Sequence, residues 1–195
     1  MTNLFLKSGT LAPKQSVLLM VDVSEQAQRM SKQDLVNYVQ KKDDGFLERA
    51  MSMVAAGLDR EFIKRTLEND IFERRSRHDL VIHKVSSMGS FASMFGMAGT
   101  VIGVVSVLRD VSDMDNIVSG LSLALLTTLY GLFFSTVIFL PLASKLQGKS
   151  KREMLSKLIL MEGVLSIYDK EIPLKVERYL KSFLDSRIYK DAKKK

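Results

Sequence analysis

Two long stretches of the chain contain no charged side chain and consist mainly of apolar residues. The first covers residues 85–108 and the second 116–144, which gives lengths of 24 and 29 residues. Because an α-helix rises about 1.5 Å per residue, roughly 20 residues suffice to cross a hydrocarbon layer about 30 Å thick. The pattern predicts transmembrane helices at 85–108 and 117–143, joined by a turn at 109–116. The alternative interpretation is a helical hairpin buried in a soluble protein.

Outside these stretches, apolar residues recur mostly at helical spacing, and no alternating strand pattern is present. Ser31 is placed to cap a helix, Asp43-Asp44-Gly45 marks a break, Asp59 is placed to cap a further helix, and Pro173 interrupts the last helical pattern. We expect an irregular segment over 1–20, a helical region over 21–84 and a helical tail over 144–195. The predicted fold class is therefore all α.

The charged residues predict how the hairpin lies in the membrane. The chain has 29 Lys and Arg against 22 Asp and Glu, a net charge of +7. Residues 1–84 carry 14 basic against 12 acidic side chains, residues 145–195 carry 14 against seven, and the turn between the spans carries one against three. Because basic residues near span ends stay in the cytoplasm, we expect both termini, and thus both helical regions, to be cytoplasmic. The excess positive charge does not indicate nucleic-acid binding, because no nucleic-acid module is recognisable.

Composition argues against enzyme chemistry. The chain has no cysteine and two histidines, which excludes disulfides and thiolate chemistry and leaves little from which to build a metal site. No pairing of nucleophile and base, no phosphate-binding loop and no metal-ligand spacing is present. We expect no enzymatic activity, no cofactor and no metal.

Small residues recur along one side of each predicted span. Gly96, Gly99 and Gly103 lie in the first span and Gly131 in the second, with other small residues between them. Such stripes mark faces on which helix backbones approach closely in membranes. A single hairpin is not expected to use both stripes fully, so the pattern favours additional helices from other copies or another protein. Packing within the chain is the alternative.

Three threonines are the most notable polar residues deep in the spans. Thr100 lies in the first span, and Thr127 and Thr128 lie in the second. A buried threonine hydroxyl commonly bonds the carbonyl four residues earlier and has no other role. An ion path at membrane depth needs an ionisable group, and neither span contains Asp, Glu, Lys, Arg or His. If the chain conducts ions, a partner must supply the carboxylate.

Three strings carry a resemblance to a known family. They are F-G-M-A-G-T-V-I-G at 95–103, A-L-L-T-T-L-Y-G at 124–131 and F-L-P-L-A-S-K-L at 139–146. With these strings the chain resembles the MotA-like flagellar stator subunits of the MotA/TolQ/ExbB proton-channel family, over roughly residues 20–184. Family members begin with two more transmembrane helices, so the resemblance implies that this sequence starts after them.

The resemblance implies a motor function in the bacterial inner membrane. Family subunits form a homo-oligomeric ring around a dimer of a MotB-like partner, whose transmembrane aspartate carries H⁺ or Na⁺, and ion flow drives the flagellar rotor. The resemblance assigns Thr100 and Thr128, with Thr127 beside them, to the ion path. It assigns Pro141 to gating and coupling. Ser93, the second gating and coupling position, stands where the family has a proline that opens its third helix, so the resemblance implies that a kink and an element of ion gating are missing here.

The rotor-facing segment departs from the family pattern. Ser31 and Val39 are aligned with a family Arg and Glu, and Lys32 and Asp34 are the charges available to replace them. We therefore expect poor torque, with partial rescue by Ser31→Arg combined with Val39→Glu. A non-motor or degenerate member of the family, acting as a membrane interaction module without conducting ions, stays the alternative.

Overall fold

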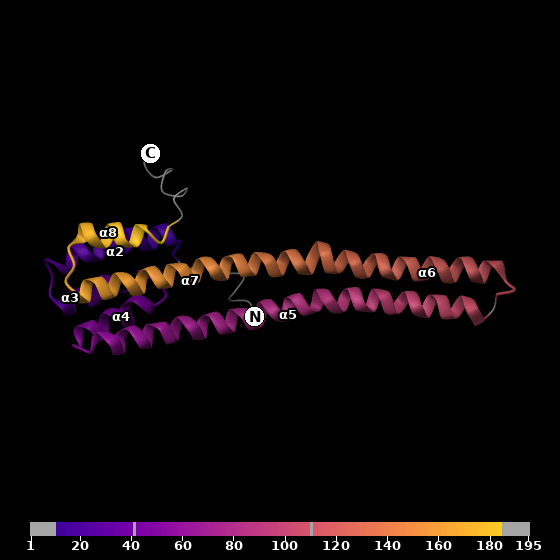
Figure 1. Cartoon of the computed structure of the whole chain (residues 1–195), viewed down its shortest axis with the longest axis horizontal. Coiled ribbons are helices and arrows are strands. Elements are labelled where there is room, and N and C mark those ends of the chain that lie inside the picture. Colours follow the sequence, from indigo (N-terminus) through magenta and orange to yellow (C-terminus); the bar gives the residue numbers. More distant parts are fainter. Residues whose placement is uncertain (1–10, 41, 110, 185–195) are drawn as a thin grey trace, which may run out of the picture. The chain divides into compact units, whose positions relative to one another are not determined.

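The structure is a computed structural model that describes residues 11–40, 42–109 and 111–184 (Figure 1). Within these residues every regular element is a helix, which confirms the all-α prediction. The elements are α2 (Pro13–Ala27), α3 (Lys32–Val39), α4 (Phe46–Ala55), α5 (Arg60–Arg109), α6 (Met114–Phe133), the π-helical stretch η1 (Phe134–Phe139), α7 (Leu140–Tyr168) and α8 (Pro173–Lys181).

The helices form two compact units. The first consists of the residues up to Ser76 together with those from Lys149 onward, and the second consists of Arg77–Gly148. Helices α5 and α7 contribute to both units. The chain thus passes from the first unit into the second and back within continuous helices.

The polar residues predicted to begin helices do so in the first unit. The Ser31 hydroxyl accepts a hydrogen bond from the Asp34 N–H at 3.2 Å, which caps α3. The Asp59 carboxylate accepts from the N–H groups of Glu61 (3.1 Å) and Phe62 (3.3 Å) at the start of α5. These bonds satisfy N–H groups that have no partner inside the helix. Local hydrogen bonding therefore sets both helix starts.

The expectation of an irregular segment over 1–20 is wrong for residues 13–20, which form the first half of α2. Pro13 occupies the first turn, where its missing N–H is not needed. The run of five apolar residues at 17–21 hides the helical period. Only Val17 and Met20 of this run are fully buried, and Val23 continues their face. Residues 1–10 lie outside the described residues.

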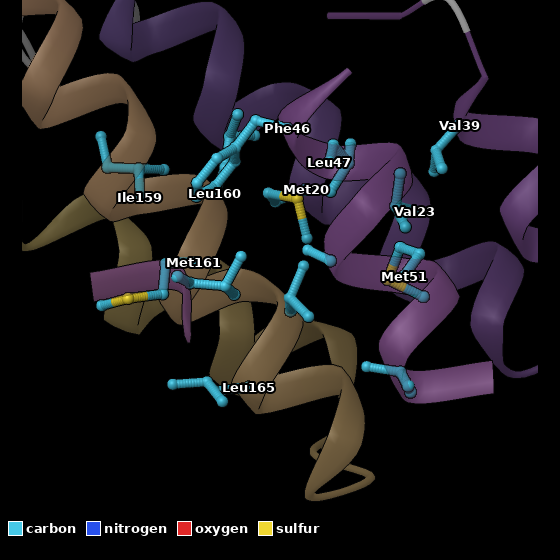
Figure 2. Packing of buried hydrophobic residues seen from close by; sticks show 14 of the residues in the cluster. Met20, Val23, Val39, Phe46, Leu47, Met51, Ile159, Leu160, Met161 and Leu165 are labelled. Atoms are coloured by element: carbon cyan, nitrogen blue, oxygen red, sulfur yellow. The ribbon is translucent and has the colours of Figure 1, made fainter. Parts of the chain in front are cut away.

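Helices α2, α4 and α7 supply most of the apolar core of the first unit. Figure 2 shows Met20 of α2, Phe46 and Leu47 of α4, and Leu160 of α7 gathered in this core. All four side chains are almost completely inaccessible to solvent. Burial of such side chains removes roughly 1.5–3 kcal/mol each of unfavourable hydration. Residues on both sides of the hairpin sequence therefore build one domain.

Helices α4 and α7 end in the same way, but with different residues in the left-handed position. Gly57 has φ +73° after α4, and Lys170 has φ +56° after α7. Each is followed by an N–H that bonds back into the helix: Leu58 to the carbonyl of Met53 at 3.3 Å, and Glu171 to that of Ser166 at 3.0 Å. This is the Schellman arrangement, which favours glycine because a Cβ is strained at positive φ.

We expect Lys170→Gly to raise the free energy of unfolding by about 1 kcal/mol, because it removes this backbone strain. Gly57→Ala should lower it by a similar amount, since nothing lies within 4 Å of the added Cβ and only the backbone conformation opposes it. Denaturant unfolding of the full chain in detergent, followed by circular dichroism, measures both. An unchanged or lower stability of Lys170→Gly would contradict the strain argument.

Candidate functional site in the apolar hairpin

The second unit is a hairpin of two long apolar helices connected near residues 111–113 (Figure 1). Helix α5 extends to Arg109, one residue into the predicted turn, and Asp113 caps α6 by accepting from the Asp115 N–H at 3.0 Å. Two helices of the described chain are long and apolar enough to cross a membrane. Only 11% and 17% of their most apolar windows are buried. Core helices of a soluble protein would be mostly buried, so the hairpin favours a membrane environment.

Glycines bring the two helices of the hairpin into backbone contact. A Cβ added to Gly131 of α6 would stand 2.7 Å from the Cα of Gly96 and 2.8 Å from the carbonyl oxygen of Ala92, both on α5. A Cβ on Gly103 would stand 2.6 Å from the Cβ of Ala124. Distances this short leave no room for a side chain. Gly96, Gly103 and Gly131 therefore lie where the two helices approach each other closely.

The two small-residue stripes pack against each other, which corrects the expectation of a surplus face. Gly96, Gly103 and Gly131 are buried within the hairpin, and Gly99 lies against the side chain of Thr127. The described residues that stay exposed on the outside are mainly bulky and apolar; Phe95 and Leu125 are examples. The spacing of small residues identifies the face of each helix that packs closely, but it does not identify the surface against which that face packs. These glycines therefore give no argument for additional helices.

Thr100 and Thr128 meet across the contact between α5 and α6. Their hydroxyl groups hydrogen-bond each other. Each also lies 3.3–3.4 Å from the carbonyl oxygens of Gly96 and Ala124. Two hydroxyl protons cannot serve all five of these contacts at once. The pair is thus an adaptable polar group at the centre of an apolar interface, and both threonines are only half-buried.

Thr127 differs from the other two threonines. Its hydroxyl donates to the Ala124 carbonyl at 2.9 Å, within its own helix, and its side chain fills the space above Gly99. The sequence places Thr127 with Thr100 and Thr128, but in the structure Thr127 does not take part in the hydrogen bonds of that pair.

The two residues expected to govern gating lie inside continuous helix. Helix α5 passes through Ser93 without interruption, as serine allows where proline would not. Pro141 follows η1, in which the Leu140 N–H donates to the carbonyl of Ser135, five residues back. A proline ring in an α-helix collides with the carbonyl four residues earlier. The wider π-helical turn before Pro141 relieves that collision and lets the helix continue.

The rotor-facing candidates divide into surface and core residues. Lys32 and Asp34 are exposed, and Ser31 caps α3 while its hydroxyl donates to the Asp34 carboxylate at 2.7 Å. Val39 is completely buried in the core of the first unit. The assignment of Val39 as a rotor-facing position is therefore wrong. The helical period of α3 places Val39 on the same inner face as Leu35, which is also buried.

Sequence reasoning misses an ion network centred on the buried side chain of Lys157. Its ammonium group contacts the carboxylates of Asp43, at 3.2 Å, and Asp44. Arg74 contacts the other oxygen of Asp44 and also bonds Asp70 at 3.3 Å. A signal is present in the sequence, because Lys157 interrupts an otherwise apolar face of α7. The pattern at Asp43 and Asp44, in contrast, indicates only a helix break.

The network sets the protonation of Asp44. Burial alone would raise the pKa of this carboxyl, but the hydrogen bond and charge of Lys157, aided by Arg74, outweigh burial and lower the pKa to about 2. A lowered pKa means that the ionised carboxylate stabilises the folded state fully above the ordinary value of 3.8. That stabilisation is lost as the pH falls toward 2.

We accordingly expect acid to destabilise the wild-type chain more than Asp44→Asn. The stability difference between the two should shrink between pH 5 and pH 2, because the amide does not titrate, and by less than about 2 kcal/mol, because solvent screens this partly exposed carboxylate. Denaturant unfolding of both chains in detergent across this range gives the measurement. A stability difference independent of pH would mean that Asp44 is not held ionised by its neighbours.

Comparison with known proteins supplies the family. Residues 39–157 match the model of the MotA/TolQ/ExbB proton channel family. The chain is 33% identical over 140 residues to the chemotaxis protein PomA of Vibrio alginolyticus, covering 72% of this chain and 55% of that protein. It is 30% identical over 180 residues to motility protein A of Borreliella burgdorferi, covering 92% of this chain and 69% of that one.

A solved structure agrees with these relatives. The flagellar MotAB stator complex from Bacillus subtilis contains a chain that matches with a TM-score of 0.84 and 28% identity, over 94% of this chain and 72% of the other. The chain thus spans a little over half of the Vibrio protein and about seven tenths of the other two. The family match includes the whole hairpin and Lys157, whereas Ser31, Lys32 and Asp34 precede it. By this match over more than half of its length, the chain belongs to the MotA/TolQ/ExbB proton channel family.

Proposed function

We propose that the chain is the MotA-like subunit of an ion-driven flagellar stator in a bacterial inner membrane. The observation that carries the proposal is the threonine pair between two apolar spans, residues 85–108 and 116–144, that contain no acidic or basic side chain, in a chain 28% identical to one in a flagellar stator complex. An ion path needs an ionisable group, and the two spans contain none. The hairpin therefore forms a wall of the path and does not itself carry the ion. A MotB-like partner supplies the carboxylate, and several copies of the chain form a ring around it.

The topology follows from the charges that flank the hairpin. Both termini lie in the cytoplasm, the connection between α5 and α6 near residues 111–113 lies on the outer side, and the first unit forms the cytoplasmic domain. The support is the basic character of residues 1–84 and 145–195 compared with the acidic turn. A reporter fused after Lys195 tests this: activity restricted to the extracytoplasmic side would overturn the proposed orientation.

The threonine pair takes part in ion passage through its adaptable hydroxyl groups. Either hydroxyl can release its carbonyl acceptor and turn toward a hydrated ion or a carboxylate of the partner. The hydroxyl of the other threonine meanwhile keeps a hydrogen bond to the carbonyl of Gly96 or Ala124. The half-burial of Thr100 and Thr128 supports this role, since one side of the pair stays accessible. The coupling ion is H⁺ or Na⁺.

We expect Thr128→Val to reduce ion flux about tenfold while leaving assembly intact. Valine keeps the branched shape but removes the hydroxyl, and a lost hydrogen bond of about 1–1.5 kcal/mol in the rate-limiting state corresponds to that factor. Thr127→Val is the matched control, because its hydroxyl is engaged within α6. Flux into vesicles containing the chain, its partner and the family's two further helices measures the effect. Equal flux in both variants would exclude the pair from the path.

A non-motor membrane module is the second candidate function. The observation that favours it is the absence of the family's charge pair: Ser31 is a helix cap and Val39 is buried. Lys32 and Asp34 are then the exposed candidates for contact with the rotor. Lys32→Ala and Asp34→Ala should lower rotation speed but not ion flux if these residues engage the rotor. A module without motor function would support neither rotation nor flux.

A further inference from the structure

Lys157 is a charged side chain in a position where an apolar one would be expected. Only 2% of its side chain is exposed, and its neighbours on α7 include the buried Leu160 and Met161. Removing an ammonium group from water costs several kcal/mol even after relaxation, and a buried ion pair often stabilises a protein no more than apolar residues of similar volume. The stability of the first unit therefore does not explain why lysine stands here.

The contacts of Lys157 connect separate parts of the first unit. Its ammonium group reaches the Asp43 and Asp44 carboxylates and lies 4.9 Å from the centroid of the Phe46 ring. The Asp43 carboxylate, 3% exposed, also accepts from the N–H groups of Gly45 at 2.9 Å and Leu47 at 3.1 Å. One carboxylate thus joins α7 to the first turn of α4.

The second carboxylate extends the network to α5. Asp44 contacts Arg74 of α5, and Arg74 bonds Asp70, which in turn accepts from Arg49 of α4 at 2.6 Å. The charges therefore form a chain from α7 through residues 43–44 to α5 and back to α4. Apolar contacts are non-directional, but charged hydrogen bonds with fixed partners specify one register.

We infer that Lys157 is a positioning residue that holds residues 43–45 and the start of α4 in one register against α5 and α7. This inference rests on the proposed function in one respect. Helices α5 and α7 both continue into the hairpin, so a fixed junction between them and the 43–45 segment is required if motion of the hairpin is to reach the cytoplasmic surface. An apolar replacement would keep the unit folded but would leave that junction loose.

The test compares variants of the full chain. Lys157→Met alone removes the cation that Asp43 and Asp44 share, leaves Asp44 with Arg74, and should lower the Tm. The triple variant Lys157→Met, Asp43→Asn, Asp44→Asn removes the positive charge of Lys157 together with the negative charges of the two carboxylates that it contacts. Its capping of α4 is retained, because the amide oxygen introduced by Asp43→Asn also accepts from backbone N–H groups. The Tm of the triple variant should return to within about 4 °C of wild type.

Two single substitutions complete the set. Lys157→Arg retains the positive charge and its capacity to donate to both carboxylates. Lys64→Met removes a lysine from an exposed ion pair with Glu68 and is the surface control. Because exposed pairs contribute little to stability, this control should leave the Tm unchanged.

Hydrogen exchange of the peptide covering residues 42–47 distinguishes positioning from stability. In the triple variant we expect exchange about tenfold faster than in wild type, with peptides from 159–165 unchanged. Lys157→Arg should retain more protection than the triple variant. Wild-type exchange in the triple variant, or equal loss of protection in Lys157→Arg and the triple variant, would overturn the inference.

Rotation in a stator-deleted flagellated host provides the functional measurement, with the partner and the family's two further helices supplied. The triple variant should lose most of its rotation speed despite restored stability, whereas Lys64→Met should keep it. Rotation that simply follows Tm would assign Lys157 a structural role only. If the wild-type chain itself drives no rotation, the proposed function fails, but the exchange comparison still decides whether Lys157 positions the segment.

Discussion

Gly131→Ala is expected to destabilise the hairpin by about 3 kcal/mol, although it adds a single methyl group. The added Cβ would overlap the Gly96 Cα and the Ala92 carbonyl oxygen, which are 2.7 and 2.8 Å from its ideal position. Both are backbone atoms, so no side chain can turn aside and the helices must separate. Overpacking of this kind costs about 1–3 kcal/mol, and helix separation also weakens the Thr100–Thr128 contact next to it.

Gly148→Ala is the matched control. No atom lies within 4 Å of its added Cβ, and alanine is favoured over glycine in a helix by about 1 kcal/mol. The same substitution should therefore stabilise the chain at one glycine and destabilise it at the other. Thermal unfolding of both variants in lipid nanodiscs measures the difference. A stability of Gly131→Ala equal to that of Gly148→Ala would contradict the close backbone contact.

The glycine contacts also change how an assembly experiment is interpreted. A leucine at Gly103 would collide with Ala124 and the carbonyl of Gly120 on the same chain. Loss of a ring in Gly103→Leu would therefore report damage to the hairpin, not to a contact between copies. Substitutions at exposed positions such as Phe95 or Leu125 are better probes of contacts with other subunits.

Val39→Glu should destabilise the first unit by about 4 kcal/mol or more. Val39 has no exposed surface and belongs to the main apolar core, so the new carboxylate would be buried without a cation or must be protonated. Combining it with Ser31→Arg, as the family pattern suggests, would thus damage the fold before it could restore rotor contact.

Asn37→Glu controls for the added charge, because Asn37 lies on the exposed side of the same helix. We expect it to change stability by no more than about 0.5 kcal/mol. Denaturant unfolding of both variants gives the comparison. If Val39→Glu unfolds at the same denaturant concentration as Asn37→Glu, the buried position of Val39 is refuted.

The sequence predicts those features that depend on local chemistry. The two apolar spans follow from the missing charges, and the helix starts at Ser31 and Asp59 follow from capping. Features that depend on which surfaces meet could not be predicted in the same way. The stripes containing Gly96 and Gly131 indicate close approach, but only the folded hairpin identifies them as partners.

Two further residues illustrate the same limit. The resemblance predicts that Val39 takes the place of a charged family residue, whereas the structure buries Val39 on the inner face that it shares with Leu35. Lys157 lies 113 residues from Asp44 in the sequence, and no local pattern links them. To predict an ion pair between residues far apart in the sequence, one must know where both segments lie in space, and hydrophobic periodicity does not give that information. The sequence can therefore mark Lys157 as unusual, but only the structure identifies its partners.

The most direct test of the stator function is rotation of tethered cells in a host without its own stators. The chain would be expressed with a MotB-like partner and the family's two further helices. We predict slow rotation, because the resemblance places Ser31 where a charged, rotor-facing residue is expected. We also predict that rotation stops when the ion gradient is collapsed or when the partner's transmembrane carboxylate is changed to an amide. Cells that contain the assembled complex but do not rotate under any ion gradient would contradict the account.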